Sequence, residues 1–503
     1  MRVVLAVALV VGCGSSLQRP DGGPDGGGLP KSDGGDAARD HTFQRVFNET
    51  PNRKIDLLFM VDNSPSMTSA QENLRANFPR FMDVLKALPE GLPDLHLAVV
   101  SSDMGIGNND IPGCNAVAGD NGSFHFAVGV SPLNTCTATN LNPDATFIAS
   151  TGGNNPQNNF TGDITAVFQC IAPLGANGCG FEQQLRSVTR ALGADGFAPP
   201  QHNQGFLRPE AYLGIVLLTD EDDCSAINNS FYDVTTNTNL ASPLGPGGSF
   251  RCSEFGHLCD GAKPGRLAPN GQVTDVVNYQ NCVSAEDQGL LISVSAFAAG
   301  VKSLKPDPAS QILVVSIQGP NQNYQVRWKT PAVTTDGPWP EIAHSCNNFP
   351  DGSFADPGVR VQQFAHEFGG NGFVYSICEA NYGPALSTIA QKIAQMMNTM
   401  CVPELVADKD GNPSNGVQPD CTLTDSIPQS NGTIKNTALS ACADNGNTPP
   451  CWSLRAAAAG ECAAGYGRVL QIDRAAPPPA NALVSISCSL CTPGVADPQA
   501  GCP

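Results

Sequence analysis

The chain has 503 residues, which is long enough for a sizeable buried core and for more than one domain. It holds 27 Lys and Arg residues against 46 Asp and Glu residues, and its formal net charge is -19. This acidic balance argues against nucleic-acid phosphates or an anionic lipid surface as the main partner, because both repel negative charge. The balance is compatible with bound divalent cations, and simple solubility would also explain it.

The N-terminus has the pattern of a bacterial lipoprotein signal. One basic residue precedes an uncharged apolar run, residues 3–11, which is too short to cross a bilayer as a stable helix. The run ends at Gly12 and Cys13, which resemble the small residue and the lipidated cysteine of a lipobox. An ordinary secretory signal followed by a chance cysteine is the alternative. We expect residues 1–13 to be a lipoprotein signal with lipidated Cys13. Because Gly14 rather than Asp follows, sorting rules predict the outer membrane, facing either the periplasm or the medium.

A tether is predicted directly after this signal. Residues 14–50 begin with a stretch rich in Gly, Pro, Asp and Ser that reaches about Asp40. Such a stretch cannot bury enough apolar surface to become ordered. We therefore expect a flexible link between the anchor and a folded body, with the membrane contacted only through the lipid.

The cysteine count indicates an oxidising compartment. Of the 19 cysteines, 18 remain once Cys13 is set aside, and an even number in an exported chain predicts disulfides. Cys488 and Cys491 form a Cys-x-x-Cys pair without a second pair to complete a thiolate zinc site. We expect all 18 cysteines to be paired in disulfides.

Alternating apolar patterns predict an α/β body over residues 51–401. Continuous apolar runs rich in β-branched residues are typical of strands buried on both faces. Helical spacing of three and four appears between these runs. Together they predict a doubly wound, mostly parallel sheet, with polar groups at the carboxyl ends of the strands forming a ligand crevice. The predicted strands are 55–61, 95–100, 213–218, 312–317 and 372–377, and the predicted helices follow Ser66 and cover 181–192 and 386–400.

Two insertions and a C-terminal region complete the predicted organisation. Residues 104–180 and 224–285 are rich in Asn, Gly, Pro and Cys, and each contains four cysteines that could pair within the insertion. Both insertions leave the carboxyl ends of strands, so they should shape whatever docks there. Residues 402–503 predict a small, disulfide-rich β appendage, with strands at 467–473 and 482–488.

The turn after the first strand carries the most specific motif of the body. Residues 62–66, Asp-Asn-Ser-Pro-Ser, match the D-x-S-x-S motif, and the body resembles a von Willebrand factor A (vWA) domain. The resemblance implies a metal ion-dependent adhesion site with Asp62, Ser64 and Ser66 as ligands and Asp220 binding directly or through water. A small hard cation prefers such oxygen ligands. We expect one divalent cation, with Mg²⁺ favoured and Ca²⁺ or Mn²⁺ as alternatives.

One position departs from the family's pattern. The vWA site takes a threonine from a loop before a central helix, and aligning that helix puts Cys179 at this position. A disulfide-bonded cysteine is no ligand for Mg²⁺. Thr151, Thr161 or Glu182 could substitute. The four acids at residues 220–223 are expected to form a solvated loop, and a second cation near Asp222 is the alternative.

These features favour a binding module over an enzyme. The sequence lacks a G-x-S-x-G elbow, an H-E-x-x-H motif and a phosphate-binding loop. We expect an outer-envelope lipoprotein that binds a protein or peptide ligand through its metal site. A structural envelope protein with a degenerate metal site is the alternative, and a metal-assisted hydrolase is a weaker one, since no base is placed beside the site.

Overall fold

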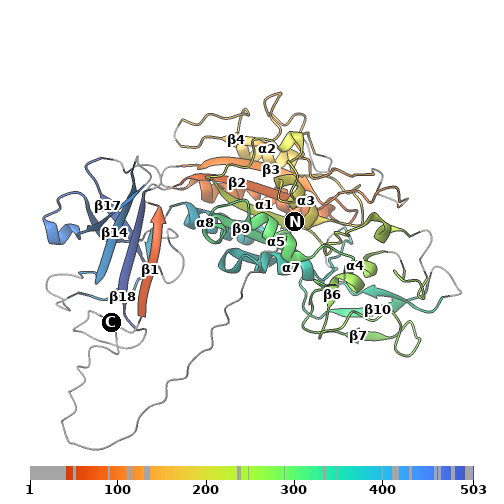
Figure 1. Ribbon diagram of the computed structural model, residues 1–503. Coiled ribbons are helices and arrows are strands. Elements are labelled where there is room, and N and C mark those ends of the chain that lie inside the picture. The colour runs from red at the N-terminus through yellow and green to blue at the C-terminus, as the bar shows by residue number, and fades with distance from the viewer. Residues whose placement is uncertain are drawn as a thin grey trace, which may run out of the picture. The chain divides into compact units, whose positions relative to one another are not determined.

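Figure 1 shows the computed structural model of the chain. The predicted signal, Cys13 and most of the predicted tether lie outside the described residues. The structure describes residues 41–502 apart from positions 49–51, 89–90, 110, 112–113, 115–116, 130–135, 154, 235–238, 247, 288, 332–335, 348, 350, 399, 410–417, 430–432, 458–461, 463–465, 477, 479–481 and 493–501.

A six-stranded sheet forms the centre of the α/β body (Figure 1). Neighbouring strands are parallel except at one edge, where β3 and β4 are antiparallel. The α/β prediction is confirmed, and all five predicted strands are present within two residues of their predicted ends. The unpredicted β4 has three residues and lies in the first insertion. In spatial order the strands are β12 (Gly372–Ser376), β9 (Ile312–Gln318), β5 (Tyr212–Leu218), β2 (Lys54–Val61), β3 (Asp94–Ser101) and β4 (Ile148–Ser150).

Helices pack on both faces of this sheet. Alternate residues of β2 enter two separate cores: Leu57 and Phe59 join one, and Leu58 and Met60 join the other. Burial on both faces explains why the strand is an uninterrupted apolar run rather than an alternating one. The first core contains α1 (Thr68–Lys86), α2 (Ile164–Ile171) and α8 (Gly383–Asn398), and the second contains α3 (Gln184–Leu192), α5 (Val294–Lys302) and α7 (Val359–His366).

The two insertions are held by their own disulfides, as their even cysteine counts predicted. Cys114–Cys179 and Cys136–Cys170 close the first, and Cys224–Cys252 and Cys259–Cys282 close the second. Both insertions also contain regular elements. These include α2 and β4 in the first, and η2 (Asn229–Tyr232), α4 (Ser249–Gly256), β6 (His257–Leu258), β7 (Val276–Asn278) and β8 (Val283–Ser284) in the second.

Smaller elements connect these parts. Strand β7 pairs with β10, which pairs in turn with β11, in a three-stranded antiparallel sheet, and β6 pairs with β8. Cys346–Cys378 links two segments that follow β11 and β12. The remaining elements are η1 (Gln201–Asn203), α6 (Pro308–Gln311), β10 (Gln325–Lys329), β11 (Trp339–Ile342) and η3 (Gly369–Asn371).

The C-terminal region is built from antiparallel strands, as predicted, and both predicted strands are present as β17 and β18. One sheet has the order β1-β18-β14-β15 and a second has the order β13-β17-β16. The predicted extent of the tether was wrong at its C-terminal end. Residues of β1 were assigned to the tether, but they form a strand that pairs with β18. The strands are β1 (His41–Asn48), β13 (Cys401–Val402), β14 (Cys421–Pro428), β15 (Ile434–Leu439), β16 (Cys451–Ala456), β17 (Arg468–Asp473) and β18 (Leu483–Leu490), with η4 at Cys442–Asn445.

Contacts along the chain define two compact units. The larger comprises Phe43–Glu404 with Cys421–Cys488, and the smaller includes Leu405–Asp420 and Ser489–Pro503. Within the smaller unit, Cys491–Cys502 and Ala407 form a hydrophobic cluster.

Every cysteine from Cys114 to Cys502 is in a disulfide, so the predicted full pairing of these 18 cysteines is confirmed. The C-terminal region contributes Cys401–Cys462, Cys421–Cys488, Cys442–Cys451 and Cys491–Cys502. Among the helices of the described residues, none combines the length and the apolar character needed to cross a membrane.

Candidate metal centre

Asp62 and Asp220 lie side by side at the carboxyl edge of the sheet. Asp62 directly follows β2, and Thr219 and Asp220 directly follow the parallel neighbour β5. The Asp62 N–H donates to the carbonyl oxygen of Leu218 at 2.9 Å, which continues the ladder one residue beyond the strands. Parallel neighbours end at the same edge, so the sheet itself brings together two acids that are far apart in the sequence.

The Asp62 carboxylate is fully buried and accepts three hydrogen bonds. Ser64 N–H and the Ser102 hydroxyl donate to Oδ1, each at 2.9 Å, and the Thr219 hydroxyl donates to Oδ2 at 2.6 Å. Burial raises the pKa of Asp62 above its usual value, and the hydrogen bonds from these donors lower it only in part. The carboxylate is thus oriented by donors from three different segments, while Oδ2, which accepts only one of the three bonds, keeps a lone pair for a further contact.

The two motif serines lie on the turn between β2 and α1. Ser64 is buried and Ser66 is partly exposed, and their hydroxyl oxygens lie 3.5 Å apart. Gln71 braces this turn, since its amide donates to the carbonyl oxygens of Asp62 at 2.7 Å and Gly175 at 2.8 Å. Sequence reasoning missed Gln71, although a polar residue on the apolar stripe of α1 was a usable signal.

Asp220 is the most unusual side chain of the cluster. It is 1% exposed, and neither carboxylate oxygen has a hydrogen-bond partner in the part of the chain that the structure describes. Burial first, and then the charges of Asp62 and Glu221, raise its pKa well above the usual range. The Ser66 hydroxyl lies near enough to lower this pKa in part.

The loop before α3 lies against the motif, as the resemblance implied. Gly178 N–H donates to the carbonyl oxygen of Asn63 at 2.7 Å, and the next residue, Cys179, is fully buried in its disulfide with Cys114. Cys179 therefore offers no oxygen ligand and no thiolate to the site.

Glu182, on the same segment, has a buried carboxylate. It is 2% exposed, and its Oε1 has no hydrogen-bond partner among the described residues. Burial and the charges of Glu221, Asp62 and Asp220 raise its pKa well above the usual range. Of the three substitutes suggested by sequence, Glu182 is the one that the structure brings to the cluster.

The structure places Thr151 and Thr161 at the opposite edge of the sheet. Ser150 pairs with Leu95 at the amino end of β3, so Thr151 follows at that end. Thr161 lies near Asp163, which bonds to Lys86 at the last residue of α1. Helix α1 has 19 residues and begins beside the motif, so its far end lies about 28 Å away. The choice of Thr151 and Thr161 as possible metal ligands was wrong, because the sequence alone did not show in which direction the insertion runs.

The acidic run at residues 220–223 is not the solvated loop that sequence predicted. Burial raises the pKa of Glu221 to about 8, with Asp356 as the next cause. Asp222 lies with Oδ2 2.6 Å from His257 Nε2, and it accepts the N–H groups of Val359, Arg360 and Val361 at the start of α7. Its oxygens are thus occupied by α7 and His257, which speaks against Asp222 as an auxiliary metal ligand.

A cavity of about 440 Å³ adjoins the motif on the side of the first insertion. Asn63 and Gly178 line it together with Asp103 and Asp120. His125 Nε2 lies 3.1 Å from Asp120 Oδ2. The site therefore has a concave neighbour whose lining includes two acids.

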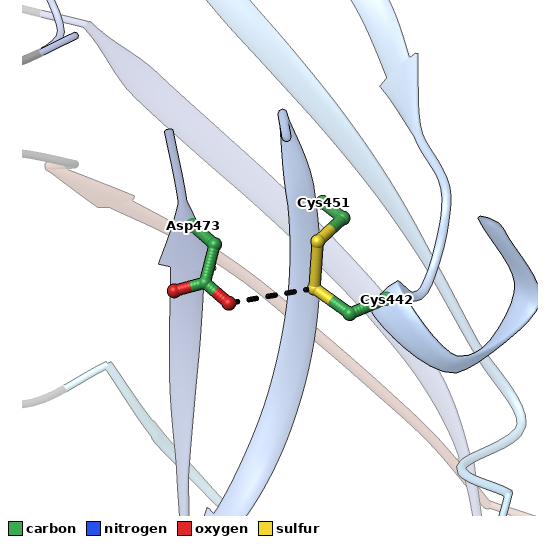
Figure 2. Close-up of side chains that lie close together, drawn as sticks. All are labelled: Cys442, Cys451 and Asp473. Atoms are coloured by element: carbon green, nitrogen blue, oxygen red, sulfur yellow. Dashed lines mark hydrogen bonds between the residues drawn. A yellow bond between two sulfur atoms is a disulfide. The ribbon is translucent and has the colours of Figure 1, made fainter. Parts of the chain in front are cut away.

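A second group of potential ligands, in the C-terminal region, is not a metal centre. Figure 2 shows Cys442, Cys451 and Asp473, whose sulfur and oxygen atoms lie close together. The two sulfurs are joined in a disulfide, so neither is available as a thiolate. The 3.6 Å contact from Cys442 Sγ to Asp473 is likewise not a true hydrogen bond, because a disulfide sulfur has no proton to donate.

No protein-family model matches the chain, and no match was found among the curated proteins. Similar solved structures include the pilus adhesin SpaC from Lactobacillus rhamnosus GG, with 11% identity, 91% of this chain and 42% of that chain covered, and a TM-score of 0.30. A von Willebrand factor type A protein from Catenulispora acidiphila has 9% identity, coverages of 89% and 65%, and a TM-score of 0.26. The vWF domain of a type V pili tip protein from Porphyromonas gingivalis has 12% identity, coverages of 69% and 98%, and a TM-score of 0.28.

Such scores are too low to support an argument about this chain. The chain also spans only 42% of the adhesin and 65% of the Catenulispora protein. The chemistry of the site therefore has to be inferred from the geometry of this chain's own residues.

The residues present fit a hard divalent cation. Two serine hydroxyls lie on the motif turn, and the Asp62 and Asp220 carboxylates follow neighbouring parallel strands. Asp220 and Glu182 hold buried oxygens that have no hydrogen-bond partner among the described residues. Burying an anionic oxygen without a partner is costly, and a cation is the partner that would offset this cost. Ser64, Ser66, Asp62 and Asp220 are the residues that would hold it.

Proposed function

We propose that this protein is an outer-envelope lipoprotein whose vWA-like body binds a protein or peptide ligand with the help of one divalent cation. The cation would be held at Asp62, Ser64, Ser66 and Asp220, with Mg²⁺ as the first expectation and Ca²⁺ or Mn²⁺ as alternatives. The observation that carries the proposal is the Asp220 carboxylate, which is buried and has no hydrogen-bond partner among the described residues.

If Asp220 had only a structural role, its carboxylate would have different surroundings. A carboxylate kept only for stability normally accepts hydrogen bonds, as Asp222 and Asp223 do. Asp220 instead has the surroundings of a ligand whose partner is an ion. The insertions that leave this edge, and the acid-lined cavity beside Asn63, would shape the surface on which a ligand docks.

Calorimetric titration with Mg²⁺, Mn²⁺ and Ca²⁺ tests the proposal. Wild type should bind one cation, Asp220→Asn and Asp62→Ala should abolish binding, and Ser64→Ala should weaken it. Asp220→Asn is the cleaner variant, because it has the same shape and removes no hydrogen bond. Asp260→Asn, an exposed acid in the second insertion, is the matched control and should titrate like wild type.

A second experiment separates a binding module from a structural envelope protein. Ligands captured from envelope extracts should be lost in EDTA and restored by the cation. Identical titrations of wild type and Asp220→Asn would contradict the metal site, and capture that is indifferent to EDTA would favour the structural role.

A further inference from the structure

The loop before α3 lacks an oxygen ligand at the position where the vWA pattern has a threonine. Cys179 is there instead, and its sulfur is bonded to Cys114 in the first insertion. If a cation is held at this edge, the ligand missing from this side must come from another residue.

Glu182 is held beside the cluster by its own backbone. Its carbonyl oxygen accepts from Cys224 N–H at 2.8 Å, and the N–H of the next residue, Gln183, donates to Ser102 O at 3.0 Å. These bonds fix Glu182 between the segments that follow β3 and β5. The neighbouring Gln184 amide donates to the Thr219 hydroxyl at 2.7 Å, which ties the start of α3 to the Asp62 site.

The carboxyl group of Glu182 lies among the other acids of the cluster. The charges of Glu221, Asp62 and Asp220 act on it, its side chain interacts with that of Glu221, and its Oε1 is buried without a hydrogen-bond partner among the described residues. Glu221 also accepts a hydrogen bond from the Ser249 hydroxyl of α4 at 3.1 Å. Asp220 and Glu182 are therefore two separate, neighbouring side chains, each with a buried oxygen that has no partner in the described part of the chain.

We propose that Glu182 is a direct ligand of the cation and replaces the missing threonine of this site. The inference rests on the proposed function, because it presupposes that a cation binds at this edge. It changes the chemistry of the site, since an anionic oxygen takes the place of a neutral hydroxyl.

This replacement has a consequence for the choice of cation. With Asp62, Asp220 and Glu182 all bound, three carboxylates more than neutralise a divalent ion, so the ion attracts an outside carboxylate only weakly. Ca²⁺ accepts several carboxylates, some of them bidentate, in irregular arrays, whereas Mg²⁺ prefers a strict octahedron with bound waters. The site should therefore prefer Ca²⁺ over Mg²⁺, and its ion should meet neutral oxygens of a docking ligand, such as carbonyl or hydroxyl groups.

Calorimetry on the full exported protein tests this with Ca²⁺ and Mg²⁺ as the probes. Glu182→Gln, which keeps the shape, should weaken Ca²⁺ binding by about tenfold or more. Glu182→Thr should shift the preference towards Mg²⁺. Glu221→Gln is the comparison variant, because it removes the charge of a neighbouring acid that already accepts a hydrogen bond from Ser249, and it should change the affinity for Ca²⁺ by less than about threefold.

Thermal unfolding with and without Ca²⁺ gives a second readout that does not depend on the heat of binding. Removing a buried, unpartnered charge should raise the melting temperature of the Glu182→Gln protein without metal and reduce the increase that Ca²⁺ produces. A carboxylate with no role in metal binding would give the first effect without the second.

The outcomes separate the two proposals. If Asp220→Asn abolishes Ca²⁺ binding while Glu182→Gln and Glu221→Gln bind like wild type, the role of Glu182 is wrong and the metal site stands. Equal losses in Glu182→Gln and Glu221→Gln would reduce Glu182 to a general charge effect and overturn its role as a ligand. If wild type binds neither cation, both proposals fail.

Discussion

The segment that carries Asp220 is anchored by a buried ion pair, and replacing Arg360 with Met should release it. Arg360 and Asp223 are both fully buried, and the Arg360 Nη2 to Asp223 Oδ2 distance is 3.0 Å. The guanidinium also donates to the Ser284 hydroxyl at 3.0 Å and to Ile292 O at 2.6 Å. Asp223 in turn accepts from Leu185 N–H, near the start of α3, at 3.0 Å. One pair thus joins α7, α3, the second insertion and the end of β5.

The size of the effect follows from burial. Arg360→Met keeps most of the side-chain volume but leaves the Asp223 charge without its cation in an interior that water does not reach. Breaking a buried pair in this way costs about 3–5 kcal/mol. Lys54 and Glu210 provide the control, because their 2.8 Å pair is as short but its side chains are 43% and 54% exposed. Lys54→Met should cost only about 0–1 kcal/mol, since water and salt screen that pair.

Urea unfolding of the oxidised protein, followed by circular dichroism, measures both variants against wild type. The double variant Arg360→Met with Asp223→Asn should recover part of the loss, because the stranded charge is removed. A loss of less than about 1 kcal/mol in the free energy of unfolding of Arg360→Met, no larger than that of Lys54→Met, would refute the argument that burial makes this ion pair stabilising.

Three further predictions concern pH, redox state and anchoring. Burial lowers the pKa of His96 below its ordinary 6.5, so the unfolded chain binds more protons just below that pH and stability should fall as the pH drops through this window. His96→Asn should lose less stability than wild type between about pH 7 and about pH 5, and an unchanged slope in urea titrations would contradict this. Thiol labelling of denatured, unreduced protein should find essentially no free thiol at the 18 cysteines from Cys114 to Cys502, and stoichiometric labelling of any of them would show an unpaired position. Cys13→Ala should move the protein from the membrane to the soluble fraction, and unchanged fractionation would remove the case for a lipid anchor.

Much of the body could be predicted from local patterns. Strands such as Ile55–Val61 were legible because burial on both faces requires an unbroken apolar run. The position of Asp62, Ser64 and Ser66 in the fold could be predicted, because a strand, a tight turn and the start of a helix follow one another within a few residues. Even cysteine counts within each insertion were enough to confine the disulfides, but not to choose between Cys114–Cys179 and its alternatives.

The acidic segment shows where sequence reasoning failed. Four consecutive acids suggest a solvated loop when only neighbours along the chain are considered. Their actual partners are remote, since Arg360 lies 137 positions from Asp223 and the first turn of α7 lies equally far from Asp222. The sequence also could not show whether Glu182 or Thr151 is the better candidate for a metal ligand, because both lie in a long connection whose path was unknown.

Spacing along the chain predicts the five central strands, three of the helices and the polar residues at the strand ends, because these are local properties. Which of those residues meet depends on how the strands pair. The parallel pairing of β2 with β5 places Asp62 beside Asp220, and the bond between Gly178 and Asn63 places the Glu182 segment beside both. The tertiary structure also decided which acids receive donors and which are buried without one, since burial depends on segments that arrive from elsewhere in the chain.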